Sequence, residues 1–267
     1  MAHARTGLRW VVAAMACFTA TASCSRVDDG TAAARGTGPF LSPPARVDLR
    51  TLSIDPSAPD TLYAATWADG LYKSTDGGEN WNLTGLTGVS VWSVVIDPQS
   101  SDRLFAGNTS GLSRSFDGGE TWSLLREDSW GPLVVDPQVS TTLYVVTNSG
   151  IEVSTDDGET WSVLLSLEQP DYAGSLTVAR PDAQSPAVLY AGVSFGVDAF
   201  IYLVRSTDGG LNWWTGDQSW YDYMPFFLID PQDPSTIYSS VAPLMKSTDA
   251  GETWTMVDPD GSRATTF

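Results

Sequence analysis

The sequence predicts an all-β protein, specifically a β-propeller of four-stranded antiparallel blades, and three observations support this. An eight-residue motif ending in tryptophan occurs five times. Each copy is accompanied by four short apolar runs that turn signals separate, which is the pattern of a propeller blade. Beyond the apolar N-terminal segment no stretch shows helical periodicity. A β-sandwich or a solenoid would not account for a strict four-strand unit.

The motif is first seen at 74–81 as Ser-Thr-Asp-Gly-Gly-Glu-Asn-Trp, and it returns at 115–122, 154–161, 206–213 and 247–254. Four of its positions are conserved in character within the chain and are predicted to be structural: Ser74, Asp76, Gly78, Trp81, Ser115, Asp117, Gly119, Trp122, Ser154, Asp156, Gly158, Trp161, Ser206, Asp208, Gly210, Trp213, Ser247, Asp249, Gly251 and Trp254.

The strands of a unit follow in a fixed order. The first run ends at an Asp-Pro turn, which contains Asp55, Asp97, Asp136 or Asp230 and is degraded to Ala179-Arg180-Pro181 in the fourth unit. The second is a Leu-Tyr-like run, the third leads into the motif serine, and the fourth follows the motif tryptophan. Five blades are visible, and the ring has five, or six or seven if the chain is a fragment.

The motif resembles the Asp-box, or BNR repeat, of sialidases, sortilin-type receptors, xyloglucan-degrading glycosidases and photosystem II assembly factors. The resemblance covers residues 48–258 and implies a propeller. It does not choose a function, because enzymes and non-enzymes share the box.

The box residues are expected to fold the turn rather than to bind a ligand. The aspartate can accept backbone N–H bonds within the turn, the glycine at the fifth position of the box (Gly78 and its equivalents) permits positive φ, and the tryptophan packs between sheets. A site for calcium or carbohydrate at every blade is the alternative. We also expect the basic residue before the box, as in Lys73, Arg114, Arg205 and Lys246, to pair with the box glutamate across the same hairpin.

The N-terminus is typical of an exported protein. Basic residues precede an apolar stretch from Trp10 to Ala22, which is too short to span a bilayer. Residues 1–23 are predicted to be a signal peptide of lipoprotein type with lipidation at Cys24. The alternative is cleavage after Ala22, which would release a periplasmic or extracellular protein. Residues 24–47 are predicted to be a flexible tether and 259–267 a C-terminal tail.

Composition excludes several chemistries. The 267 residues carry a net charge of −18, with 14 basic and 32 acidic residues. The sequence has no cluster of Lys and Arg that could bind nucleic acid, so a nucleic-acid partner is not expected. The single histidine, His3, and the two cysteines, Cys17 and Cys24, all lie near the N-terminus. Downstream of Cys24 there can be no Ser-His-Asp triad and no zinc site built on His or Cys. No metal, no cofactor and no catalytic residue is assigned, and a membrane is contacted only through the lipid.

Ligand binding is expected on the rim opposite the boxes, because the box rim is occupied by repeated structural sequence and variable loops on a rigid scaffold carry function. That rim is predicted to present exposed aromatic residues and carboxylates, which suit a carbohydrate or protein ligand: Trp67, Asp69, Glu127, Asp128, Trp130, Asp198, Trp214, Trp220, Tyr221 and Asp222. Some aromatic residues, such as Trp92 and Phe227, are expected in the core instead.

The sequence favours a non-enzymatic scaffold for binding or assembly in the bacterial cell envelope. The alternative is a sialidase-like or other glycoside hydrolase with two rim carboxylates. Sialidases also need an arginine cluster and carry an Arg-Ile-Pro motif before the boxes, and this motif is absent here.

Overall fold

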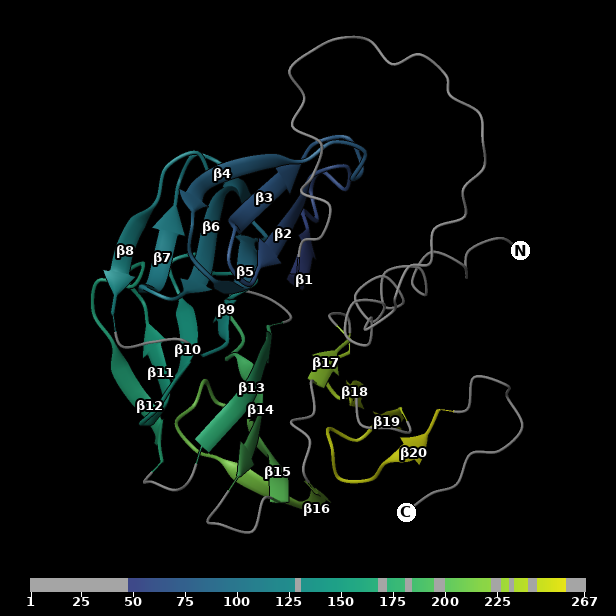
Figure 1. Ribbon diagram of the computed structural model, residues 1–267. Helices are drawn as coiled ribbons and strands as arrows, with labels where there is room; N and C mark the ends of the chain where they lie inside the picture. The colour runs from purple at the N-terminus through teal and green to yellow at the C-terminus, as the bar shows by residue number, and fades with distance from the viewer. Residues whose placement is uncertain are drawn as a thin grey trace, which may run out of the picture.

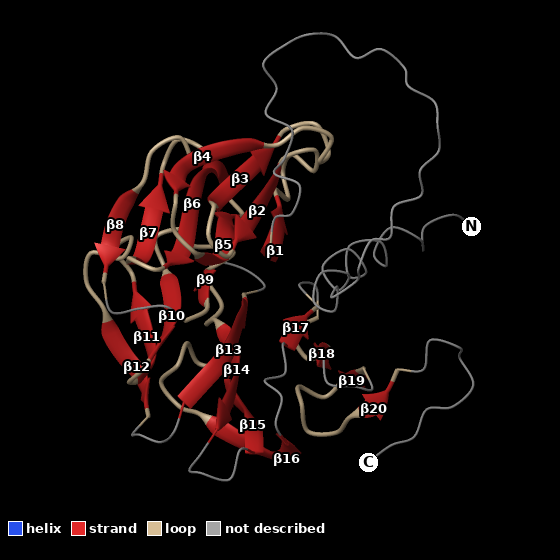
Figure 2. Cartoon of the chain, in the orientation of Figure 1, coloured by secondary structure: helices blue, strands red, loops and turns tan. Residues whose placement is uncertain are grey.

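The computed structural model describes residues 48–127, 131–167, 172–180, 184–194, 200–221, 227–230, 233–239 and 244–257, without the side chains of 172 and 217–221. Every regular element in these ranges is a β-strand (Figure 2). Within the same ranges there is no helix long and apolar enough to cross a membrane. The expectation of an all-β chain is confirmed.

The first two blades take up the chain from residue 49 to residue 126. Blade 1 consists of β1 (Leu49–Ile54), β2 (Leu62–Thr66), β3 (Gly70–Ser74) and β4 (Asn82–Thr87). Blade 2 consists of β5 (Val91–Asp97), β6 (Ser100–Asn108), β7 (Gly111–Ser115) and β8 (Ser123–Arg126). In both sheets each strand pairs antiparallel with the next one in sequence, so each blade is a simple meander.

The other three blades repeat this topology. Blade 3 is β9 (Leu133–Val135), β10 (Leu143–Thr147), β11 (Gly150–Ser154) and β12 (Ser162–Ser166). Blade 4 is β13 (Tyr172–Ala179), β14 (Val188–Ser194), β15 (Phe200–Ser206) and β16 (Trp214–Tyr221). Blade 5 is β17 (Phe227–Ile229), β18 (Ile237–Ser239), β19 (Met245–Ser247) and β20 (Thr255–Met256).

The five blades follow one another around an arc, from blade 1 in blue to blade 5 in yellow (Figure 1). Neighbouring blades meet through their first strands: β1 packs beside β5, β5 beside β9, β9 beside β13, and β13 beside β17. This is the radial arrangement of a propeller, and the predicted fold is confirmed.

The core lies between the blades, as expected for sheets that cannot bury both faces alone. An apolar cluster fills each junction, and each cluster takes residues from two successive blades. In the second strand, the residue directly before the aromatic one packs against the preceding blade. It is completely buried in blades 2 to 5, as Leu104, Leu143, Leu189 and Ile237. Burying such a side chain contributes about 1.5–3 kcal/mol.

Four of the five box tryptophans pack at these junctions, as predicted. Trp122, Trp161 and Trp213 pack against the clusters that join their blade to the preceding one, and Trp254 is part of such a cluster with 1% of its surface exposed. Each indole Nε1 also donates to the carbonyl of the box glycine, for example Trp122 to Gly119 at 2.9 Å. The polar end of the ring is therefore satisfied while its body fills the junction.

Candidate ligand-binding rim

The Asp-boxes and the Asp-Pro turns share one rim, as the sequence predicted. In blade 1 the backbone N–H of Gly77 donates to the carbonyl of Asp60. In blade 2 the backbone N–H of Gly118 donates to the carbonyl of Asp102. The corresponding bonds of the later boxes join Asp157 to Thr141, Gly209 to Ala187 and Ala250 to Ser235. Each box turn is thereby fixed to the turn between the first two strands of its own blade.

Hydrogen bonds within each box explain why the aspartate is needed. In the first box Ser74 Oγ donates to Asp76 Oδ1 at 2.8 Å, and the backbone N–H of Asn80 donates to the same oxygen at 2.9 Å. The side chain of Asn80 donates to the second carboxylate oxygen. Bonds from this residue and its equivalents Thr121, Thr160 and Asn212 lower the pKa of Asp76, Asp117, Asp156 and Asp208 to about 2.

In the fifth box, burial raises the pKa of Asp249, but hydrogen bonds from Thr253 and Ser247 outweigh it and leave that pKa below its ordinary value. The box carboxylates are thus held ionised by their own turns. Among the described residues no group of His, Cys, Asp or Glu is arranged to hold a metal ion.

The expected pair between the basic residue before the box and the glutamate of the same box is wrong. Lys73 Nζ donates to the carbonyl of Gly118, in the box turn of the next blade, at 3.0 Å. Arg114 and Arg205 reach the next box in the same way, with Nη1 bonds of 2.9 Å to the carbonyls of Asp157 and Ala250. We call this contact the box latch. It joins blades rather than strands, because the side chain projects across the junction.

The glutamates that these arginines meet also belong to the next blade. Arg114 pairs with Glu159 at 3.0 Å, and Arg205 pairs with Glu252 at 3.9 Å. Both glutamates are about two-thirds exposed, so these ion pairs contribute little beside the carbonyl bonds. Blade 3 has Val153 at the latch position and joins blade 4 through apolar contacts.

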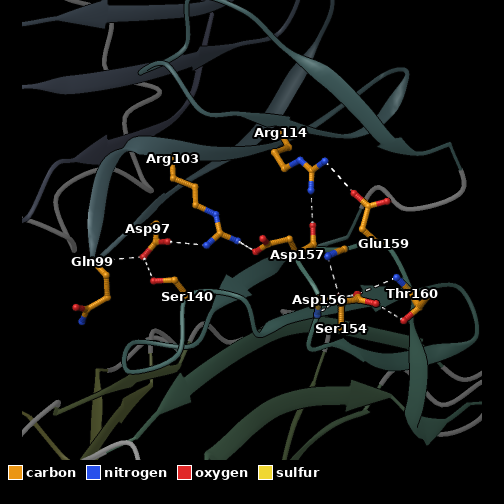
Figure 3. A network of polar contacts seen from close by, with 11 residues as sticks. Asp97, Gln99, Arg103, Arg114, Ser140, Ser154, Asp156, Asp157, Glu159 and Thr160 are labelled. Carbon is orange, nitrogen blue, oxygen red and sulfur yellow. Dashed lines mark hydrogen bonds and ion pairs between the residues drawn. The ribbon is translucent and has the colours of Figure 1, made fainter.

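A buried ion network strengthens the junction of blades 2 and 3 (Figure 3). Arg103 bonds Asp97 Oδ2 at 3.1 Å within its own blade and also bonds the carboxylate of Asp157 in the next. Ser140 Oγ and the backbone N–H of Gln99 donate to the other oxygen of Asp97, each at 2.9 Å. At this junction, the carboxylates of Asp97 and Asp157 on the box rim are therefore bonded within the protein.

At the junction of blades 1 and 2, the opposite rim carries an exposed tryptophan beside a second tryptophan and an arginine. Trp67 lies in the loop between β2 and β3 and is 48% exposed. Its ring lies 6.0 Å from that of Trp92 in an edge-on arrangement, and the guanidinium of Arg50 stacks 3.9 Å above it. We call Arg50, Trp67, Asp69, Ser90 and Trp92 the tryptophan rim.

The loop that carries Trp67 is held rigidly. Thr66 Oγ1 donates to the carbonyl of Gly70 at 2.7 Å and accepts from the backbone N–H of Asp69 at 3.1 Å. Gly70 has φ 101°, and a Cβ there would lie 2.1 Å from the carbonyl oxygen of Leu86, so only glycine fits. Ser90 Oγ donates to the carbonyl of Trp67, which ties the loop to the start of blade 2.

The tryptophan rim combines an exposed indole, a guanidinium and an exposed carboxylate. The Nε1 of Trp92 is buried and has no hydrogen-bond partner among the described residues. Aromatic rings with nearby charged and hydroxyl groups can stack on a sugar ring or receive an apolar peptide side chain while polar groups bond its periphery.

The other predicted rim residues lie elsewhere. Glu127 directly follows β8 and is exposed. Trp220 and Tyr221 are the last residues of β16, opposite Ile201 and Phe200, and their side chains are outside the described part. Asp128, Trp130, Asp198 and Asp222 lie outside the described residues altogether.

The expected position of Trp214 is wrong. The sequence predicts it on the rim opposite the boxes, but it begins β16 and pairs with Arg205, directly after the fourth box. Its ring is 37% exposed and lies 4.9 Å from the guanidinium of Arg205. It therefore belongs to the box rim. The sequence missed this because β16 runs for eight residues through a segment that reads as a loop.

Three members of the tryptophan rim, Arg50, Ser90 and Trp92, were not predicted as site residues. Trp92 was expected in the core, since it begins an apolar run, and Arg50 carries no motif. Simple alternation along β5 does not place Trp92, because Val91 and Val94 are both buried although they are three positions apart, and the pairing register shifts between Val91 and Ser93. Arg50 and Ser90 could be placed only from the packing of the two blades.

Comparisons with known proteins agree with this architecture. The family model described as BNR/Asp-box repeat matches residues 113–124. No curated protein sequence matches the chain. Among solved structures, the GH74 enzyme of Niastella koreensis is similar with a TM-score of 0.60 and 18% identity, over 78% of this chain and 38% of that one.

Two further structures show how widely the fold is shared. YCF48 from Cyanidioschyzon merolae has a TM-score of 0.53 and 16% identity, over 85% of this chain and 73% of that one. A component of the COPII outer coat vertex has a TM-score of 0.59 and 12% identity, over 80% of this chain and 62% of that one. The chain spans well under half of the GH74 enzyme, and at these identities the likeness shows the fold alone. The chain is therefore a β-propeller that contains the BNR/Asp-box repeat.

Proposed function

We propose that the protein is an exported, lipid-anchored and non-enzymatic propeller that acts as a binding or assembly scaffold in the bacterial cell envelope. Its ligand, a protein or a carbohydrate, binds at the tryptophan rim. The observation that carries this proposal is the contrast between the two rims. The box rim uses its charged groups for bonds between blades, whereas the opposite rim holds Trp67 exposed on a rigid loop beside Trp92 and Arg50.

The anchoring part of the proposal rests on the N-terminal sequence, in which Cys24 ends an apolar stretch and precedes a polar segment. Its test is fractionation of the expressing bacteria. The wild-type protein should sediment with membranes and carry a lipid, and Cys24→Ala should move it to the soluble fraction. An unlipidated wild-type protein, released after Ala22, would contradict the anchor while leaving the rim proposal intact.

The non-enzymatic part is tested on aryl sialosides and on β-glucan oligosaccharides. The glucan substrates are chosen because the box motif resembles that of xyloglucan-degrading glycosidases. We expect no hydrolysis of either class. Turnover that Glu127→Gln or Asp222→Asn abolishes would overturn the proposal and favour a glycoside hydrolase that uses rim carboxylates.

A further inference from the structure

The two ends of the arc expose positions that every internal junction buries. The aromatic residue of the second strand faces the following blade and is at most 4% exposed in blades 1 to 4, at Tyr63, Phe105, Tyr144 and Tyr190. Tyr238 holds this position in blade 5 and is only partly buried. The same holds in the third strand, where Leu71, Leu112, Ile151 and Leu203 are buried and Leu244 is partly exposed.

At the other end of the arc, blade 1 exposes a position that faces the preceding blade in all the other blades. In the second strand, the residue directly before the aromatic one faces the preceding blade and is completely buried in blades 2 to 5. Leu62 holds this position in blade 1 and is partly exposed. Among the described residues no apolar cluster joins blade 5 to blade 1, although a cluster fills each of the four internal junctions.

The donor half of a box latch is present on blade 5. Lys246 precedes the fifth box serine, as Lys73 precedes the first. Lys246 Nζ lies 5.4 Å from the Tyr238 ring, and Lys73 Nζ lies 5.6 Å from the Tyr63 ring, so the two pairs are arranged alike. Lys73 Nζ also donates a hydrogen bond to the carbonyl of Gly118 in the next blade. Lys246 has no hydrogen-bond or ion-pair partner within the described ranges.

The acceptor half is present on blade 1. Gly77 holds in the first box the position that Gly118 holds in the second, and both have φ near 70°. Around Gly118 lie Lys73 and Tyr63 of the preceding blade, whereas the only side-chain atom near Gly77 comes from Asp60 of its own blade. Gly78 likewise meets only its own Trp81, while Gly119 packs against Thr84 of the preceding blade.

We propose that the protein associates head to tail, with blade 5 of one copy packed against blade 1 of a second copy. The new junction continues the blade interface that the chain already repeats four times. Lys246 donates to the box-turn carbonyl at Gly77 of the second copy, and Tyr238 and Leu244 are covered by its Leu62 face. A second copy is the occupant that fits because one chain carries both halves of the latch.

This interface is heterologous, since different surfaces meet, so association either closes into a ring of copies or continues as a filament. It is independent of the tryptophan rim, which lies at the junction of blades 1 and 2 and is left free. The number of copies is the quantity that the experiment measures, and any number above one satisfies the proposal.

The test uses single engineered cysteines in the full chain, with Cys17 and Cys24 replaced by serine. At the junction of blades 1 and 2, Ser53 Oγ donates to the carbonyl of Val94 at 2.6 Å. Leu228 and Leu52 hold the corresponding positions on blades 5 and 1. Mixing Leu228→Cys with Leu52→Cys should give disulfide-linked dimers under mild oxidation, and each variant alone should give at least fivefold fewer.

Sedimentation velocity gives the second readout. We expect the wild-type protein to associate with increasing concentration, Lys246→Ala to shift the midpoint at least fivefold upward, and Lys246→Arg to retain association, because arginine makes the latch at Arg114 and Arg205. Lys73→Ala is the matched control: it removes an internal latch and should not change the midpoint. A protein that stays monomeric and forms no mixed disulfide would overturn the proposal. So would a disulfide that forms only when both cysteines are in one chain.

Discussion

Arg103 of blade 2 bonds the carboxylate of Asp157 in blade 3, and Asp157 stands where three of the other boxes have glycine. Its backbone is left-handed with φ 66°, a conformation that costs a residue with a Cβ roughly 1 kcal/mol or more. The ion pair to the preceding blade offsets this cost. Ala250, with φ 61°, occupies the same place in the fifth box without such a bond.

Replacing Asp157 by glycine should therefore destabilise the protein although it relieves the backbone. The variant loses a charge-assisted bond to Arg103, and the partial exposure of Asp157 moderates the loss. We expect a decrease of about 1 kcal/mol in the free energy of unfolding, measured by urea denaturation. Ala250→Gly is the matched control: it relieves the same backbone conformation without removing an ion pair, and it should stabilise the protein by up to about 1 kcal/mol. A stabilising effect of Asp157→Gly would show that the ion pair contributes less than the relief of the backbone, and would contradict this account.

The box latch predicts an order among substitutions at Arg114. Arg114→Ala should destabilise by about 1–2 kcal/mol, because it removes the bond to the Asp157 carbonyl at a junction between blades. Arg114→Lys should retain most of the stability, since Lys73 makes the same contact in blade 1. Glu159→Gln should have little effect, because Glu159 is largely exposed. If the glutamine variant were as unstable as the alanine variant, the ion pair rather than the latch would hold the junction.

The box carboxylates predict how stability depends on pH. The pKa of Asp156 is lowered from 3.8 to about 2, chiefly by bonds from Thr160, so the folded state favours its ionised form. Its contribution is present above the unfolded-state pKa and is lost as the pH falls from about 4 to 2. Asp156→Asn should lower the urea midpoint at pH 7, and its difference from wild type should shrink across that window. A difference that stays constant from pH 7 to pH 2 would contradict the account.

The sequence predicted the blades well because each turn is encoded locally. The serine, aspartate and glycine of a box bond one another within eight residues, so the motif specifies its turn wherever it occurs. The apolar alternation then places residues such as Leu104 and Leu143 against a neighbouring sheet.

Contacts between blades could not be predicted in the same way. Arg114 and its acceptor, the carbonyl of Asp157, are 43 positions apart, and no local rule prefers this partner to the glutamate of the same box. The sequence predicts Trp214 on the rim opposite the boxes, because residues 214–221 have a turn-like composition although they form strand β16. Arg50 reaches Trp67 only after β1 and β2 pair, so the composition of the tryptophan rim follows from tertiary structure.

The most direct test of the central claim compares two exposed aromatic residues on opposite rims. Trp67 is on the tryptophan rim, and Phe116, 56% exposed, is in the second box. Wild type, Trp67→Ala and Phe116→Ala are applied to an array of cell-envelope polysaccharide fragments and of peptides. We predict that wild type binds at least one class of probe, that Trp67→Ala weakens this binding at least tenfold, and that Phe116→Ala leaves it unchanged. Binding that survives Trp67→Ala but is lost in Phe116→Ala would place the function on the box rim and contradict the account.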